Sequence, residues 1–252
     1  KLTFLIYLSA WLASREGQRE QHTLENGLIP FLSALGSVVL LIVLQPDTGS
    51  MSVIVLMSLF VYFLSGAPLK WFVSLSVLGS GLLFCLIRHS HYRAARFMAF
   101  LHPELDPLGV GYHINQAMLA IGSGGWFGLG YCHSRQKFLY LPEVEADSIR
   151  AVIAEEMGFV VMILLLIVFA ALIGRCLKIS KEARDPFGRY LAAGVAAWIA
   201  IQLFLNIGSM TGVMPMTGVT LPFISHGGSA MVALLAAMGL VMGIPRHNGR
   251  SR

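Results

Sequence analysis

Long apolar blocks joined by short polar segments constrain the fold of this chain more than any single motif does. A soluble domain carries roughly 25% charged residues, whereas this chain carries 12% and is 56% hydrophobic. The blocks lack the two-residue alternation of a membrane β-barrel, so we expect them to cross a bilayer as α-helices, which satisfy their own backbone groups. We predict an all-α integral membrane protein, a polytopic helical bundle whose spans are residues 2–13, 27–44, 51–66, 71–87, 151–173, 190–210 and 221–242.

Lysine and arginine are distributed unevenly among the segments that join these blocks. Most of them lie in residues 14–26, 66–70, 174–189 and the tail after residue 242. Short basic segments mark the cytoplasmic side, so residues 88–150 are expected to form a large extracytoplasmic loop with interfacial segments. The chain then divides into residues 1–87 with four spans, the loop 88–150, and residues 151–252 with three spans and a cytoplasmic tail. We expect earlier spans to precede the first block, which is short for a crossing of roughly 20 residues.

Charge and cysteine content argue against several function classes. The net charge of +5 reflects membrane topology, and no basic patch interleaved with aromatic residues indicates a nucleic-acid partner. Cys85, Cys132 and Cys176 show no paired spacing. The histidines lack the i, i+4 spacing of a helical zinc motif. We therefore predict no nucleic-acid binding, no disulfide framework and no metal held by thiols or histidines.

Among the acidic residues of the outer loop, Asp147 is the strongest candidate for a functional role. It lies just before the apolar block 151–173, at a depth where ionisable side chains are costly and usually serve function. A structural role fits the local sequence equally well, because an aspartate there can cap the helix and pair with Arg150. Glu155 and Glu156 follow in the next turns. We expect one of them to face the same cavity and the other to be outward-facing or structural.

Arg93 and Arg96 are three residues apart in the outer loop and would share one face of a helix. Guanidinium groups match the oxygens of a diphosphate, which a membrane enzyme acting on a lipid-linked donor must bind. Interfacial arginines also meet ordinary anionic lipids. Spacing alone favours the lipid interpretation.

Two motifs interrupt apolar blocks with proline and glycine. Residues 45–49 place Asp47 in a turn, where it either caps the following helix or faces a cavity. Residues 221–229 contain two adjacent glycines, which permit close packing of helices or close approach of a ligand.

In order along the chain, these motifs resemble one family, the SEDS proteins of shape, elongation, division and sporulation. The amino-acid sequence of these motifs is more similar to that of the division and sporulation branch around FtsW than to that of RodA. The resemblance covers nearly the whole chain and rests on Gln45-Pro46-Asp47-x-Gly49, Arg93-x-x-Arg96, Gly122-Ser123-Gly124-Gly125, Ser134-Arg135-Gln136-Lys137-x-x-Tyr140-Leu141-Pro142-Glu143, Asp147, Glu155-Glu156-x-Gly158 and Leu221-Pro222-Phe223-Ile224-Ser225-x-Gly227-Gly228-Ser229.

The resemblance implies a ten-span fold, of which this chain holds spans four to ten, in the bacterial cytoplasmic membrane at the division septum. It also implies a peptidoglycan glycosyltransferase that polymerises lipid II at the outer face. In this reaction the 4-hydroxyl of one disaccharide attacks the anomeric carbon of another, and undecaprenyl diphosphate leaves with inversion. The implied partners are a class B penicillin-binding transpeptidase, other divisome membrane proteins and membrane lipids.

The resemblance also assigns roles to individual residues. Asp147 matches the family's essential loop aspartate, and a general base there would take the proton of the attacking hydroxyl. Cationic side chains would neutralise the leaving diphosphate, with a divalent cation, Mg²⁺ or Mn²⁺, as an additional candidate whose ligands stay unassigned. The expected substrate-binding residues are Gln45, Asp47, Arg93, Arg96, Gln116, Gln136, Lys137, Glu143, Ser225, Gly227, Gly228 and Ser229.

Two other function classes remain open from the sequence. A lipid II flippase needs an amphipathic cavity and cations for the diphosphate, but no carboxylate placed against a hydroxyl. A non-catalytic scaffold of the divisome needs only its packing faces. The neighbourhood of Asp147 keeps the scaffold open, because relatives usually carry His-Thr-Asp-Phe-Ile-Phe where this chain reads Glu145-Ala146-Asp147-Ser148-Ile149-Arg150.

Overall fold

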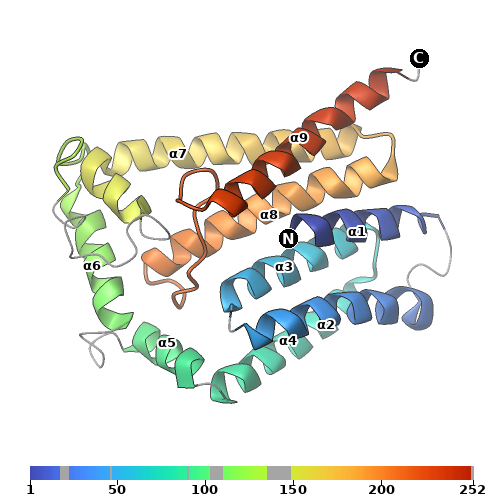
Figure 1. Cartoon of the computed structure of the whole chain (residues 1–252), viewed down its shortest axis with the longest axis horizontal. Coiled ribbons are helices and arrows are strands. Elements are labelled where there is room, and N and C mark those ends of the chain that lie inside the picture. Colours follow the sequence, from blue (N-terminus) through green and yellow to red (C-terminus); the bar gives the residue numbers. More distant parts are fainter. Residues whose placement is uncertain (18–22, 46, 90, 103–109, 135–148, 251–252) are drawn as a thin grey trace. The chain divides into compact units, whose positions relative to one another are not determined.

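The computed structural model describes residues 1–17, 23–45, 47–89, 91–102, 110–134 and 149–250, and these residues form helices joined by turns, without a strand (Figure 1). Four helical stretches are long and apolar enough to cross a membrane, namely Leu24–Leu44, Ile149–Glu182, Pro186–Met210 and Gly228–Arg246. Three shorter apolar helices lie at Leu2–Ala13, Thr48–Leu64 and Leu69–Leu82. The all-α membrane class is confirmed, and the count of seven spans stays a prediction.

The chain packs as two compact units. The first unit contains residues 1–76, 171–201 and 228–252, and the second contains residues 77–170 and 202–227. Three helices, α4 (Leu69–His89), α7 (Ile149–Glu182) and α8 (Pro186–Met210), contribute residues to both. The division of the chain at residues 87 and 150, which follows predicted topology rather than packing, stays a prediction.

In the first unit, α1 (Leu2–Ala13) packs against α3 (Thr48–Leu64) and α9 (Gly228–Arg250), and α2 (Ile29–Leu44) lies beside α3 (Figure 1). A single π-helical turn, η2 (Leu24–Leu28), leads into α2. Phe31 of α2 stacks on Tyr62 of α3 with ring centroids 4.3 Å apart. Gly194 of α8 lets α1 approach, because a Cβ at that position would lie 2.2 Å from a methyl of Leu5. Small residues at such contacts are how membrane helices pack closely.

The last apolar block does not begin where the sequence predicted. We expected a span from residue 221, but α9 begins at Gly228. Residues 221–227 instead form a turn in which the Ser225 hydroxyl accepts a hydrogen bond from the backbone N–H of Leu221, and Phe223 adopts a positive φ of 62°. Pro222 lacks an N–H group, and the serine offers the backbone an alternative to the helical bond, so the helix starts later.

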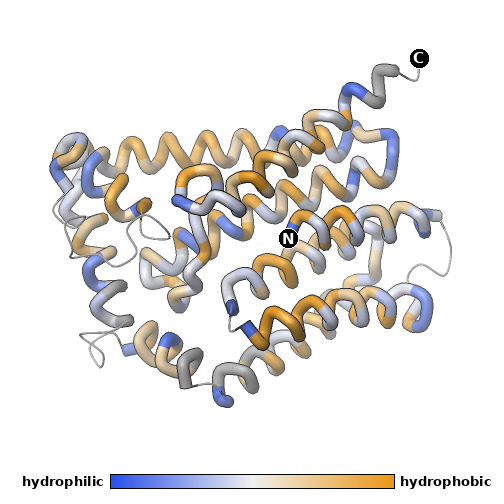
Figure 2. The backbone as a smooth tube through the Cα atoms, viewed as in Figure 1, coloured by the Kyte–Doolittle hydropathy of each residue, from blue (hydrophilic) through white to orange (hydrophobic). Residues whose placement is uncertain are grey.

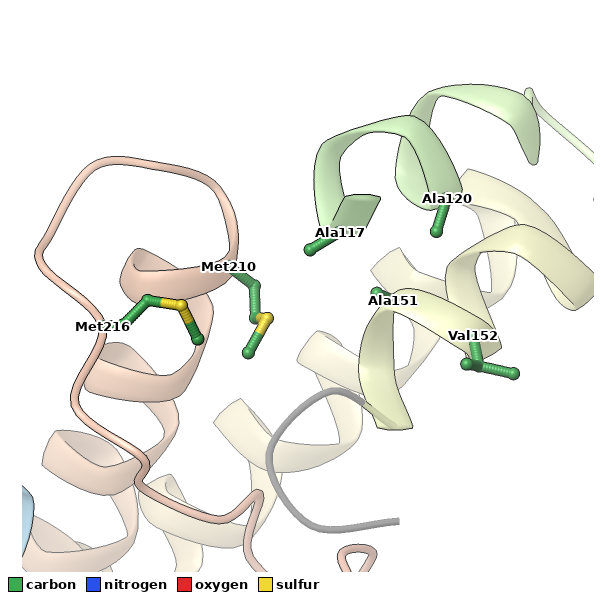
Figure 3. Close-up of a cluster of buried hydrophobic side chains, with 6 residues drawn as sticks. All are labelled: Ala117, Ala120, Ala151, Val152, Met210 and Met216. Atoms are coloured by element: carbon green, nitrogen blue, oxygen red, sulfur yellow. The ribbon is translucent and has the colours of Figure 1, made fainter. Parts of the chain in front are cut away.

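In the second unit, α5 (His91–Leu101) packs against α6 (Val110–Ser123). A small apolar cluster joins α6, the start of α7, the end of α8 and the loop that follows it (Figure 3). Alanines supply the α6 side and two methionines supply the α8 side, and the members are Ala117, Ala120, Ala151, Val152, Met210 and Met216. Short alanine side chains let the helices approach, and flexible methionines fill the space that remains. The apolar colouring continues along most of α7 (Figure 2).

A kink at Gly158 divides α7 into a short initial segment and a long apolar segment. Gly158 has φ 76° and ψ −179°, a conformation that is essentially confined to glycine. The loop 124–130 lies directly against this kink. Four backbone hydrogen bonds join the two, from Leu129 N to Glu155 O, from Gly130 N to Glu156 O, from Phe159 N to Gly125 O and from Val160 N to Trp126 O. Their N···O distances lie between 2.9 and 3.1 Å.

Glycine on both sides makes this contact possible. A Cβ on Gly158 would lie 2.3 Å from the backbone nitrogen of Gly128. A Cβ on Gly124 would lie 2.0 Å from the carbonyl oxygen of Ala154, and one on Gly128 would lie 2.1 Å from that of Glu156. We call this backbone contact, made by Gly124, Gly128 and Gly158, the glycine contact.

Gly158→Ala is expected to destabilise the protein strongly, because the added methyl meets backbone atoms and the backbone conformation costs a further 1–3 kcal/mol, roughly, for a residue with a side chain. Thermal unfolding of the full-length protein in detergent would measure the effect as a lower Tm. Gly174→Ala is the matched control in the same helix, since nothing lies within 4 Å of its Cβ position. Alanine there improves helix propensity by about 1 kcal/mol. Equal Tm values for the two variants would contradict the glycine contact.

Candidate functional site

The described structure contains some of the predicted site residues, and the others lie outside it. Gln136, Lys137, Glu143 and Asp147 fall in residues 135–148, which the structure does not describe. Their predicted roles are therefore untested. The structure does describe the residues on either side of this segment, Ser134 and Ile149.

Ser134 is the last described residue before the segment, and it is attached to α7. Its hydroxyl donates a hydrogen bond to the carboxylate of Glu155. Its backbone N–H donates to Oε1 of Glu156 over 3.3 Å. The Ser134 side chain is 1% exposed. Residue 134 is thus bound through both its side chain and its backbone.

The other end of the segment meets the same part of α7. Helix α7 begins at Ile149, and Glu155 follows about 9 Å along the axis at 1.5 Å per residue. Ser134 and Ile149, the described residues on either side of residues 135–148, therefore both lie at the first two turns of α7. The glycine contact holds these turns against the loop 124–130.

Both glutamates of α7 are buried, with exposures of 1% for Glu155 and 9% for Glu156. Of the two alternatives for the second acid, outward-facing or structural, burial excludes the outward-facing one. Each instead accepts a hydrogen bond from Ser134. Burying a carboxylate is costly unless it is paired and hydrogen-bonded, so attaching the segment is a structural reason for these acids. Ser134 itself was absent from the predicted site residues, although it opens the motif that contains Gln136 and Lys137.

Arg150 is buried in the first turn of α7 and is 3% exposed. One guanidinium nitrogen, Nη2, donates to the carbonyl oxygen of Ile207 near the end of α8 at 3.2 Å. The other, Nη1, is buried without a hydrogen bond to any residue of the described chain. A cation is favourable near the C-terminal end of a helix, where carbonyl groups lack partners. Arg150 thus links the start of α7 to the end of α8.

Arg93 and Arg96 both lie on α5, as the predicted shared helix requires. Nη1 of Arg96 donates to the carbonyl oxygen of Met216 over 3.4 Å. Met216 belongs to the apolar cluster of Figure 3, together with Ala151 of α7. Arg96 therefore contacts the loop that also packs against the start of α7. Gln116, on α6, lies in the turn that carries Ala117 of the same cluster.

Two polar residues of α8, which the sequence analysis missed, hold the loop that follows this helix. The side-chain amide of Gln202 donates to the carbonyl oxygen of Thr220 at 2.9 Å. The amide of Asn206 donates to the carbonyl oxygen of Val219 at 2.7 Å. Polar residues four apart on an otherwise apolar span share one face, and that spacing was the available signal. Ser225, a predicted substrate residue, supports the next turn of the same loop through its bond to Leu221.

Of the remaining described candidates, all but Gly227 belong to the first unit. Asp47 caps α3, where its carboxylate accepts a hydrogen bond from Ser50 N at 2.9 Å. The helix-cap interpretation of Asp47 is therefore confirmed. Gln45 ends α2, and Gly228 and Ser229 open α9, whereas Gly227 ends the preceding loop. Substrate binding by these residues stays a prediction.

A divalent-cation site does not arise from the described residues by themselves. No three of their His, Cys, Asp and Glu side chains gather closely enough to hold a metal. The buried pair Glu155 and Glu156 already accepts hydrogen bonds from Ser134. A role for Mg²⁺ or Mn²⁺ stays a prediction.

Comparison with known proteins identifies relatives along the whole chain. The sequence pattern of the FtsW/RodA/SpoVE family, described as cell cycle protein, matches residues 1–250. Stage V sporulation protein E of Bacillus subtilis is 39% identical over 98% of this chain and 67% of its own length. A probable peptidoglycan glycosyltransferase FtsW of Thioalkalivibrio sp. is 40% identical over 98% of this chain and 62% of its own length. This chain therefore spans about two thirds or less of the length of these relatives.

Solved structures share the fold. A chain from a peptidoglycan synthase complex that coordinates polymerization and crosslinking has a TM-score of 0.77 and 29% identity, over 96% of this chain and 68% of that one. The rod shape determining protein RodA of Thermus thermophilus has a TM-score of 0.65 and 28% identity, over 100% of this chain and 64% of RodA. Sequence and structure agree with the resemblance that the motifs indicated, and the chain belongs to the FtsW/RodA/SpoVE family of SEDS membrane proteins.

Proposed function

We propose that this protein is a peptidoglycan glycosyltransferase that polymerises lipid II at the outer face of the cytoplasmic membrane during cell division. The observation that carries the proposal is that Ser134 and Ile149, which flank residues 135–148, both lie at the first turns of α7. Relatives named probable peptidoglycan glycosyltransferases support the activity. Precise placement of a reacting group is what catalysis of this kind requires.

In this proposal Asp147 acts as the general base. An alcohol is a weak nucleophile, and a carboxylate within hydrogen-bond reach of its proton typically contributes about 10²–10⁴-fold to the rate. The proton of the 4-hydroxyl passes to Asp147 while the oxygen attacks the anomeric carbon. The bond to the diphosphate breaks on the opposite face, which inverts the anomeric configuration.

The leaving undecaprenyl diphosphate carries the charge that accumulates in this step. Arg93, Arg96 and Lys137 are proposed to neutralise it. Arg96 of α5 donates to the carbonyl oxygen of Met216, and Met216 packs in the same apolar cluster as Ala151 at the start of α7. This position supports a place for Arg96 near the reaction. Arg150 is not assigned this role, because its guanidinium is buried against α8.

A class B penicillin-binding transpeptidase is the proposed partner, and the division septum is the proposed location. The solved synthase complex, which couples polymerization to crosslinking, supports such a pairing. A lipid II flippase is the alternative function. It would use the same cations but would not depend on a base at Asp147.

Asp147→Asn is expected to abolish glycan-strand formation, a loss of at least about 100-fold, because the amide cannot accept the proton. The assay uses purified lipid II and the full-length protein with its partner transpeptidase, whose own catalysis is disabled. Asp185→Asn is the matched control. Asp185 accepts a hydrogen bond from Gly188 N at the start of α8, and asparagine caps helices as well as aspartate.

The outcomes separate the transferase from the other two functions, the flippase and the scaffold. Polymer from the native protein and from Asp185→Asn, with none from Asp147→Asn, supports the transferase and its base together. Equal polymer from all three keeps the enzyme and removes Asp147 from the mechanism. No polymer from the native protein favours the flippase or the scaffold.

Ser134→Ala is expected to lower the polymerisation rate about tenfold, because the segment loses its side-chain attachment to α7. A loss of this size corresponds to about 1.4 kcal/mol of transition-state stabilisation. Ser37→Ala removes a hydroxyl that donates only within its own helix and should leave the rate unchanged. Initial rates at saturating lipid II would measure both. An unaltered rate for Ser134→Ala would show that this attachment does not position the reacting group.

A further inference from the structure

The loop 124–132 turns large apolar side chains outward. Phe127 is 84% exposed, Tyr131 76% and Trp126 66%. Leu129, between them, is also exposed. No charged residue occurs from Ser123 to Cys132. We call Trp126, Phe127, Leu129 and Tyr131 the aromatic loop.

The exposure of these side chains is built into a fixed backbone. The loop makes four backbone hydrogen bonds to the kink of α7, and the glycine contact presses the two backbones together. Those bonds fix the backbone of the turn beside α7 while its large side chains stay exposed. Contiguous exposed apolar surface of this kind marks a contact with a membrane or with another protein.

The aromatic loop continues the apolar surface of α7. Trp126 meets Phe159 of α7 edge to face, with ring centroids 5.4 Å apart. Beyond Phe159, the exposed side chains of α7 are apolar for several turns and include Val160, Ile163, Leu164, Ile167 and Val168. Only 11% of the most apolar stretch of α7 is buried. Such an apolar, exposed surface is what a membrane-spanning helix in contact with lipid presents.

The composition of the loop identifies its depth. Tryptophan and tyrosine concentrate where a bilayer changes from hydrocarbon to headgroups, because their rings are apolar and each carries one polar group. The loop lies at the kink, beyond which α7 becomes continuously apolar. The other side of the kink carries Glu155, Glu156 and Arg150.

We propose that the aromatic loop inserts into the boundary between headgroups and acyl chains of the outer leaflet and fixes the depth of α7 in the membrane. The kink at Gly158 then lies at that boundary. The turns before it, which carry Arg150, Glu155 and Glu156, lie at the level of the headgroups. This inference rests on exposure, hydrogen bonding and composition, and it holds whichever reaction the protein performs.

Tryptophan fluorescence in vesicles tests the proposal. The full-length protein is placed in phosphatidylcholine vesicles whose acyl chains carry bromine either near the headgroup or near the bilayer centre, since bromine quenches tryptophan only on close approach. The signal of Trp126 is the difference between the native protein and Trp126→Phe. Phe127→Trp in the Trp126→Phe background places a second probe at the most exposed position of the loop.

We expect bromine near the headgroup to quench the Trp126 emission strongly and bromine near the bilayer centre to quench it much less. The same pattern is expected for the Phe127→Trp probe. Aqueous iodide should quench neither probe fully. Quenching by iodide without quenching by bromine, for both probes, would overturn the proposal. The measurement is repeated with the partner transpeptidase bound. Loss of bromine quenching only in that complex would assign the loop to the partner rather than to lipid, and would likewise overturn it.

Discussion

The glycine contact is the constraint on which the outer part of the second unit depends. Gly124, Gly128 and Gly158 let two backbones approach so closely that a Cβ at any of them would overlap a neighbouring backbone atom. The resulting hydrogen bonds bend α7 and fix the loop 124–130 beside the bend. Buried carboxylates, the attachment of Ser134 and the outward aromatic side chains all follow from the position of that loop. A rigid base of this kind suits the proposed site, whose general base Asp147 lies in the sequence between Ser134 and α7.

The apolar cluster at the start of α7 extends this base to other helices. Ala117 and Ala120 bring α6 close, and Met210 and Met216 connect the end of α8 and its loop (Figure 3). Arg96 and Arg150 each donate to a backbone carbonyl at this junction. Arg96, one of the cations expected to meet a diphosphate, therefore also has a structural partner. In the described chain, the partner of Arg150 is the carbonyl oxygen of Ile207.

Much of the fold could be predicted from the sequence because hydropathy identifies membrane helices directly. The block 2–13 became a helix with the predicted bounds, and Asp47 became the helix cap that its turn suggested. The start of the last helix was wrong, since hydropathy extended it to residue 221 while Pro222 and Ser225 formed a turn. The burial of Glu155 and Glu156 also escaped prediction. It depends on Ser134, more than 20 residues away in sequence, and no local pattern encodes such a contact. The site residues of 135–148 remain predictions carried by family resemblance.

The amides of Gln202 and Asn206 have a consequence for where irregular chain can lie. Inside a membrane, a loop is tolerated only where its backbone groups find partners within the protein. The carbonyl groups of Val219 and Thr220 accept hydrogen bonds from these two side chains. The backbone N–H of Leu221 donates to the hydroxyl of Ser225. These side chains of α8 and of Ser225 take the place of the water molecules that the backbone groups of residues 219–221 would otherwise need. A loop whose backbone groups are satisfied in this way can lie below the membrane surface, because it needs no water at those groups.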